Sequence, residues 1–247
     1  MSTPLPPSAR LAWWATAWLR GHVVTDLVVD AVIGPDATHA VAGLPGSDAT
    51  ETLVGALGRL RALGATAVGA AFPVDGDPAG LGGPAGFNRE ALAAGEAVVV
   101  AEAGVGLVPQ RTGAAITWVA HAAQRRQLPD VGEADRGLRA ALPAAADALA
   151  ALDVARWRPD VADELIDLRR ATPLQAPPGV PARCVELAGR ALQAMAVVDL
   201  ALEDDGGALS VAQASLRRES LQPLGAAARR GLVAACSPEV WPERGRF

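Results

Sequence analysis

The sequence predicts an α+β fold, in which an N-terminal layer of helices on a mostly antiparallel sheet is followed by an all-helical C-terminal half. Short apolar and β-branched runs alternate with helical segments up to residue 125, and from Glu133 onward apolar residues recur at helical spacing. Hydrophobic residues make up 51% of the 247 residues, enough for a large core without metals or disulfides. We therefore expect an α+β domain at residues 1–125 and a helical domain at residues 133–247, packed either separately or as one globular unit.

Two helices are predicted at the start of the N-terminal half. The first spans residues 9–20, because Ser8 is a favourable N-cap and Gly21 a favourable C-terminal stop. The second spans residues 25–33 and ends at Gly34, which a proline follows.

Half of the chain's six tryptophans lie in the first of these helices. Trp14 and Trp18 share a face with Leu11, whereas Trp13 points elsewhere. Two exposed indoles on a monomer would promote aggregation. We therefore expect this helix, with Trp13, Trp14 and Trp18, to be buried against the sheet or to form the contact of a homo-oligomer.

The rest of the N-terminal half alternates strands, helices and turns. Asp48 and Glu51 have capping-box spacing before a helix that Gly64 ends, and Asn88 caps a short helical turn that ends at Gly95. Apolar runs predict strands at 38–42, 66–72, 97–101, 105–109 and 114–120. The last of these runs also fits a helix.

Residues 110–115, with the sequence Gln-Arg-Thr-Gly-Ala-Ala, lie between two of these strands. They are similar to the loop with which the GNAT acetyltransferases hold the pyrophosphate of coenzyme A at the start of a helix. The spacing from Pro109 to Gly113 is shorter than in that family, so we predict a turn between two strands here.

The C-terminal half is predicted from apolar periodicity. Leu138, Leu142 and Ala145 begin an apolar stripe, in which Pro143 forces a kink or a fresh start. Further helices are expected at 160–170, at 181–202, from Ser210, and from Pro223 to residue 235. Residues 181–202 are apolar on nearly all sides, so we place this helix at the centre of a bundle.

Composition excludes several classes of function. The chain contains no lysine, which rules out Schiff-base, P-loop and pyridoxal-phosphate chemistry. Its net charge of -5 argues against binding of nucleic acid. No stretch approaches the roughly 20 apolar residues of a membrane span, so we expect no membrane insertion and a cytoplasmic location. The abundance of Ala, Gly, Arg and Pro suggests a high-GC bacterial genome, and Cys184 and Cys236 are expected to be buried thiols.

The loop at residues 74–86 is the first candidate site. It combines two acidic residues with five glycines and leads toward a helix start. Glycines let a backbone approach a ligand closely, and a helix N-terminus offers free N–H groups to an anion. The candidate ligand-binding residues are Asp75, Asp77, Gly82, Gly83, Asn88 and Arg89.

Acidic residues on two of the predicted helices form a second candidate. Asp163 and Asp167 lie on one face of the helix at 160–170, and Asp199 and Glu203 end the helix at 181–202. Carboxylates from neighbouring helices can hold Mg²⁺ and support hydrolysis. The alternative is a solvated helix start that complements the helix dipole, together with a polar exit turn.

No motif in the sequence identifies an activity. A nucleophile elbow, a phosphate-binding loop and a zinc-protease motif are all missing, and we expect no cofactor. The favoured hypothesis is a non-enzymatic protein that binds a small ligand or a protein partner, because no nucleophile, base and orienting group can be assigned. The alternative is a hydrolase or transferase that uses the acidic residues, with Mg²⁺ as an option.

Overall fold

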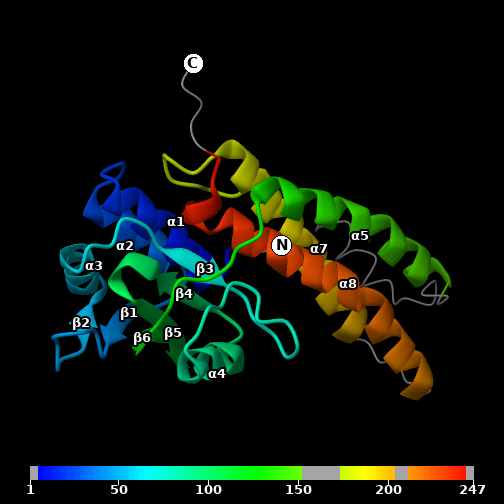
Figure 1. Ribbon diagram of the computed structural model, residues 1–247, viewed down its shortest axis with the longest axis horizontal. Helices are drawn as coiled ribbons and strands as arrows, with labels where there is room; N and C mark the ends of the chain where they lie inside the picture. Colours follow the sequence, from blue (N-terminus) through cyan, green and yellow to red (C-terminus); the bar gives the residue numbers. More distant parts are fainter. Residues whose placement is uncertain (1–4, 152–172, 204–210, 243–247) are drawn as a thin grey trace.

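The computed structural model confirms the α+β class, with a mixed sheet and its helices in the N-terminal half and long helices in the C-terminal half (Figure 1). The structure describes residues 5–151, 173–203 and 211–242. The helix expected at 160–170 lies outside these residues.

The sheet has six strands in the order β2-β1-β6-β5-β4-β3. Their bounds are Thr38–Ala42 (β1), Glu51–Thr52 (β2), Gly69–Ala71 (β3), Ala97–Val100 (β4), Val105–Thr112 (β5) and Ala115–Ala122 (β6). Strands β1 and β6 pair in parallel, and the other neighbouring strands are antiparallel. The sheet is therefore mostly antiparallel, with one parallel pair that the sequence pattern did not indicate.

The β5–β6 hairpin settles the segment that fitted both a strand and a helix. Eight residue pairs join the two strands, and a tight turn at Gly113 and Ala114 connects them. Gly113 has a φ of 59°, the positive value that two-residue hairpin turns require. The prediction of a turn at residues 110–115 is confirmed, because a strand and not a helix follows it.

The helices of the N-terminal half are Pro7–Leu19 (α1), Thr25–Ile33 (α2), Leu53–Ala62 (α3), Ala85–Ala94 (α4) and the short 3-10 turn Ala101–Ala103 (η1). Their starts differ from the predicted caps. Helix α1 begins at Pro7, so Ser8 lies inside it, and Asn88 lies inside α4. Helix α3 is capped by Thr52, whose hydroxyl accepts the Gly55 N–H at 3.2 Å. Pro7 starts α1 earlier than predicted, because proline is favourable at the first helical position. In α3 the Thr52 hydroxyl is the cap instead of Asp48.

The inner face of α1 also differs from the prediction. Trp13 is fully buried, and its indole N–H donates to the Ala235 carbonyl at 3.1 Å. Trp14 and Trp18, which were expected to form the inner face, are half-buried at the margin of the core. Arg61 stacks on Trp18 at 3.5 Å from the ring centroid. The tryptophans of α1 thus pack within the chain.

The C-terminal half contains the helices Val131–Ala151 (α5), Ala182–Glu203 (α7) and Val211–Ala235 (α8), followed by the 3-10 turn Pro238–Val240 (η3). Helix α8 packs along both α5 and α7, whereas α5 and α7 barely touch each other. The central helix of this half is therefore α8 and not α7. The last residues of α8 are fully buried because they reach the sheet and α1.

Two prolines lie inside these helices without dividing them. Pro143 lies within α5 and Pro223 within α8, so the predicted fresh start at Pro223 is wrong. Both prolines lie on the exposed side of their helices. The same geometry leaves Leu142 42% exposed, whereas Leu138 is fully buried, so the predicted stripe is only partly internal.

Both faces of the sheet are covered. Val98 and Val100 of β4 belong to the main apolar cluster, which includes side chains from α1, α3, α5, α7 and α8. Val99 points to the opposite face and packs in a smaller cluster with Phe87 of α4. The main cluster is continuous from the sheet into the helical half.

Candidate functional site

The structure places the predicted ligand-binding loop against the protein itself. Val74 and Asp77 exchange two backbone hydrogen bonds around a tight turn, and the Asp77 carboxylate lies 3.4 Å from the Arg229 guanidinium of α8. Asp75 is exposed at the turn tip, and Arg89 is exposed with only a 3.7 Å contact to Glu90. These charged residues do not converge on one point.

The glycines of this loop serve close packing. A Cβ at Gly82 would lie 2.7 Å from the Arg125 carbonyl oxygen, and the Gly83 carbonyl accepts the Gln124 N–H at 3.0 Å. The Asn88 amide oxygen accepts the Gly83 N–H at 3.0 Å. The close approach expected toward a ligand is made instead to the chain's own backbone, and the ligand-binding role of the loop stays a prediction.

The predicted metal ligands are only partly described. Asp163 and Asp167 lie outside the described residues, as does the side chain of Glu203. Asp199 is exposed on α7. Within the described part of the chain, no group of three or more His, Cys, Asp or Glu side chains could hold a metal ion.

The structure reveals a different candidate site, a cavity of about 370 Å³ where α1, the start of α7 and the end of the described chain meet. We call it the Trp241 cavity. It is lined by Arg20, His22, Gly179, Pro181, Pro238, Trp241 and Pro242. In Figure 1 the yellow connection before α7 and the red end of the chain lie beside α1 in this region.

The end of α1 sets the backbone positions of Arg20 and His22, the two polar residues of the Trp241 cavity, whose side chains are exposed. The His22 N–H donates to the Ala17 carbonyl at 2.8 Å, and the Gly21 N–H donates to the Trp18 carbonyl at 2.9 Å. With Gly21 at a φ of 74°, this is a Schellman motif, which ends a helix in one defined backbone geometry. Arg20 and His22 flank the glycine and are therefore held on a rigid turn.

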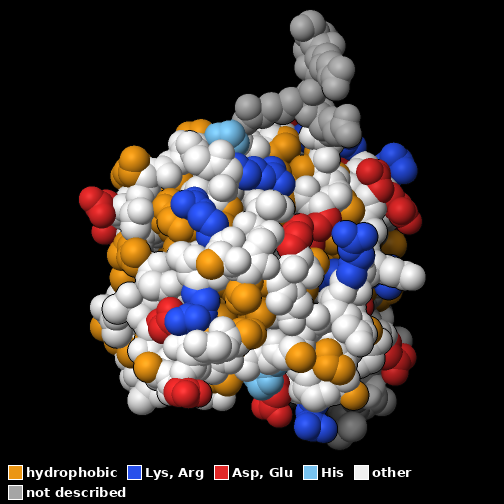
Figure 2. Space-filling model, turned by 60° about the vertical axis from the view of Figure 1, so that its left-hand side comes forward, with side chains coloured by type: hydrophobic (Ala, Val, Ile, Leu, Met, Phe, Trp, Pro, Cys, Tyr) orange, Lys and Arg blue, Asp and Glu red, His pale blue; other side chains and the backbone are white. Residues whose placement is uncertain are grey.

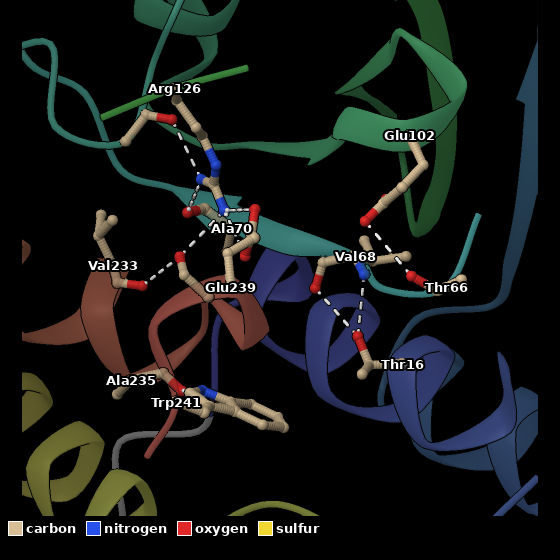
Figure 3. Close-up of polar contacts among 12 residues, drawn as sticks. Thr16, Thr66, Val68, Ala70, Glu102, Arg126, Val233, Ala235, Glu239 and Trp241 are labelled. Atoms are coloured by element: carbon tan, nitrogen blue, oxygen red, sulfur yellow. Dashed lines mark hydrogen bonds and ion pairs between the residues drawn. The ribbon is translucent and has the colours of Figure 1, made fainter. Parts of the chain in front are cut away.

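Trp241 forms a fixed wall of the cavity. Its indole N–H donates to the Ala235 carbonyl at 2.9 Å, as Figure 3 shows at the end of α8. The same carbonyl accepts the Trp13 indole, so two tryptophans converge on one oxygen. The Arg20 guanidinium carbon lies 5.6 Å over the Trp241 ring, within the range of a cation–π contact.

The segment before α7 closes the cavity and depends on a glycine. Gly179 has a φ of 101°, and a Cβ there would lie 2.6 Å from the His22 ring. The positive φ favours glycine here, and the missing side chain leaves room for the imidazole. Pro181, Pro238 and Pro242 supply rigid walls that have no backbone N–H.

Comparison with known proteins places the chain in a family. Two family models, described as the N-terminal and the C-terminal domain of Rv1486c-like protein, match residues 8–133 and 132–233. The chain belongs to the Rv1486c-like family. No solved structure matches it.

Relatives of this Rv1486c-like protein occur in mycobacteria. The chain is 29% identical to uncharacterized protein Rv1486c of Mycobacterium tuberculosis, with 96% of this chain and 99% of the relative covered. It is 27% identical to uncharacterized protein ML1804 of Mycobacterium leprae, over 96% and 99% of the two chains. It is 30% identical to uncharacterized protein MAV321 of Mycobacterium avium, over 73% and 74%. These relatives have no assigned function, and their bacterial source agrees with the origin inferred from composition.

A buried arginine joins the two halves of the Rv1486c-like chain. Strand β3 is an edge of the sheet, and its Ala70 N–H donates to the Cys236 carbonyl after α8. The Arg126 guanidinium donates to the Ala70 carbonyl at 2.6 Å, and to the Ser237 hydroxyl and the Glu239 carboxylate at 2.9 and 3.2 Å (Figure 3). Arg126 therefore takes the place of a neighbouring strand at this edge.

A second polar network lies near the start of α1. Asp36 accepts hydrogen bonds from Arg10 at 2.6 Å, Arg111 at 3.0 Å and His39 at 3.1 Å. The Trp118 indole donates to His39 Nδ1 at 3.2 Å, which leaves the imidazole proton on Nε2, facing Asp36. The carboxylate and the imidazole are thus occupied within the protein, so we assign this network a structural role.

The same contacts set the pKa values in this network. Burial lowers the pKa of His39, and the hydrogen bond to Asp36 opposes this effect without cancelling it. Burial alone would raise the pKa of Asp36, but the hydrogen bonds from His39, Arg111 and Arg10 hold that pKa below its usual value. At neutral pH the network contains a neutral imidazole and an ionised carboxylate.

Charges of both signs are spread over the surface shown in Figure 2. Blue, red and orange side chains are interspersed on this face, without a field of one sign. None of the described helices is long and apolar enough to span a membrane.

Proposed function

We propose that this Rv1486c-like protein binds a small molecule in the Trp241 cavity. The observation that supports the proposal is the combination of a volume of about 370 Å³ with walls of proline and tryptophan and two polar side chains, Arg20 and His22. Small-molecule sites are typically concave, mostly apolar and furnished with a few fixed polar groups, with volumes of about 300–1,000 Å³. The Trp241 cavity lies at the lower end of that range, which favours a ligand of one or two rings.

The composition of the cavity favours binding over catalysis. Its lining includes one imidazole, and no serine, threonine or cysteine lies among the residues that form it. The two cysteines of the chain are buried, and burial raises the pKa of Cys184 to about 12. A thiol in that state is a poor nucleophile at neutral pH. The hydrolase or transferase alternative thus gains no support from these groups.

A fragment screen tests the proposal directly. Ligand-observed NMR with a library of small molecules should yield binders to the wild-type protein at millimolar concentration. The variant His22→Trp fills the cavity from its rigid rim and should abolish their binding. Leu27→Trp is the matched control, because Leu27 is a 52% exposed residue of α2 that does not line the cavity.

The two results that would overturn the proposal are clear. A screen without any binder to the wild-type protein would contradict small-molecule binding. Binders that tolerate His22→Trp as well as they tolerate Leu27→Trp would show that the site lies elsewhere. Circular dichroism of both variants confirms that each is folded before binding is compared.

A further inference from the structure

We infer that the ligand of the Trp241 cavity is a small aromatic acid, whose ring stacks on Trp241 and whose carboxylate pairs with Arg20 and His22. The inference rests on the proposed function and specifies the ligand class. It follows from the charge of the cavity, from the geometry of the indole, and from what the walls cannot supply.

The ionisable side chains that line the cavity are all basic. Arg20 and His22 are its ionisable side chains, and no aspartate or glutamate is among the residues that line it. Within the described residues, the Arg20 guanidinium has no hydrogen bond or ion pair, and its recorded contact is the face of Trp241. The buried Arg10 and Arg126 are each paired with a carboxylate, whereas Arg20 is exposed at the cavity. An anionic ligand would supply the carboxylate that Arg20 lacks.

The backbone adds to the positive character of the site. Pro181, in the cavity wall, directly precedes α7, a helix of 22 residues with no acidic side chain in its first turn. The N-terminal end of a helix carries a partial positive charge that this helix does not neutralise with its own side chains. This partial charge adds to the attraction of an anion by Arg20 and His22, which remain the main binding groups.

The Trp241 ring is prepared for stacking. The hydrogen bond from its N–H to Ala235 uses the one polar atom of the indole and fixes the ring plane. The prolines offer no N–H donor, so among the lining side chains only those of Arg20 and His22 can donate to a ligand beside the apolar Trp241 and proline rings. A ligand with a planar ring could stack on Trp241, and one anionic group on that ring could pair with Arg20 and His22.

A carboxylate fits the donors better than a phosphate. One guanidinium presents a planar fork that pairs with the two oxygens of a carboxylate. A phosphate monoester carries a third oxygen and a second negative charge, for which the cavity has only the imidazole. We therefore rank the carboxylate first and make the phosphate an arm of the test.

The test compares matched probes by isothermal titration calorimetry. Naphthoate should bind at least about tenfold more tightly than naphthamide, which lacks the charge, because a charge-assisted pair is stronger than a neutral hydrogen bond. It should also bind more tightly than cyclohexanecarboxylate, which lacks the flat ring, and naphthyl phosphate should not exceed it. Arg20→Gln should weaken naphthoate binding about tenfold and leave naphthamide unchanged. Arg230→Gln, at an exposed position of α8 outside the cavity, is the control.

The outcomes separate this inference from the proposed function. If naphthamide binds as tightly as naphthoate, and His22→Trp blocks both, the cavity binds small molecules and the aromatic-acid inference is wrong. The same conclusion follows if cyclohexanecarboxylate equals naphthoate, if naphthyl phosphate binds tenfold more tightly, or if Arg20→Gln has no more effect than Arg230→Gln. If the fragment screen also gives no binder, the proposed function itself fails.

Discussion

Replacing Arg126 with methionine should destabilise the protein at the junction between the sheet and α8. The Arg126 side chain is 1% exposed, and its guanidinium donates to the carbonyls of Ala70 and Gly80, at 2.6 and 3.1 Å, as well as to Ser237 and Glu239. Burial lowers the pKa of Arg126, but it starts so high that the charge is retained at neutral pH. Methionine has a similar length and none of the donors.

The magnitude follows from the groups left behind. Each buried carbonyl without a donor costs about 1–3 kcal/mol, so Ala70 and Gly80 together account for about 2–6 kcal/mol. The Glu239 carboxylate is 28% exposed, and water restores part of its solvation. Breaking a buried pair on one side typically costs about 3–5 kcal/mol, and we expect Arg126→Met to fall in this range. For a chain of this size, the melting temperature should fall by about 6–20 °C.

Thermal unfolding followed by circular dichroism measures this loss. Arg125→Met is the matched control, because Arg125 is the exposed neighbour of Arg126 and its replacement should change stability by at most about 0.5 kcal/mol. Arg126→Lys should lie between the two, since an ammonium group cannot reproduce the planar fork. An Arg126→Met protein that melts within about 2 °C of Arg125→Met would refute the reasoning.

Three further predictions concern packing and pH. Leu138→Ala should cost about 2–5 kcal/mol in urea unfolding and Leu142→Ala less than about 0.5, although both lie on one predicted stripe; equal losses would contradict the burial pattern. Gly82→Ala should cost about 1–3 kcal/mol, because its Cβ would lie 2.7 Å from a backbone oxygen, whereas Gly86→Ala, with open space around it, should be neutral or stabilising. The folded state lowers the pKa of His39 from the ordinary 6.5, so the unfolded chain takes up the proton first. The associated stability is complete above that value and is lost as the pH falls below it, and His39→Gln should make the urea midpoint less dependent on pH between about 7 and 5.

Much of the fold could be predicted because local patterns report local structure. Two strands with a turn around Gly113 were predicted for β5 and β6, although the second run also fitted a helix, and the stop of α1 follows from Gly21. The errors arise where the burial of a residue depends on which other element packs against its segment. Periodicity puts Leu138, Leu142 and Ala145 on one stripe of α5, but it does not show that packing buries Leu138 and Ala145 and leaves Leu142 42% exposed. Likewise, an apolar helix such as α7 need not be the central one.

The candidate site shows the same limit more sharply, because its residues come from three segments far apart in the chain. Arg20 and His22 end α1, Gly179 precedes α7, and Trp241 follows α8. Each is ordinary in its own neighbourhood: an arginine and a histidine around a helix stop, a glycine among prolines, a tryptophan near the last turn. The loop at residues 74–86 drew attention because its acids and glycines are concentrated in sequence, yet those glycines serve packing against the chain. Local density of unusual residues therefore identified a tight turn, whereas the cavity exists only because the buried end of α8 holds Trp241 against α1.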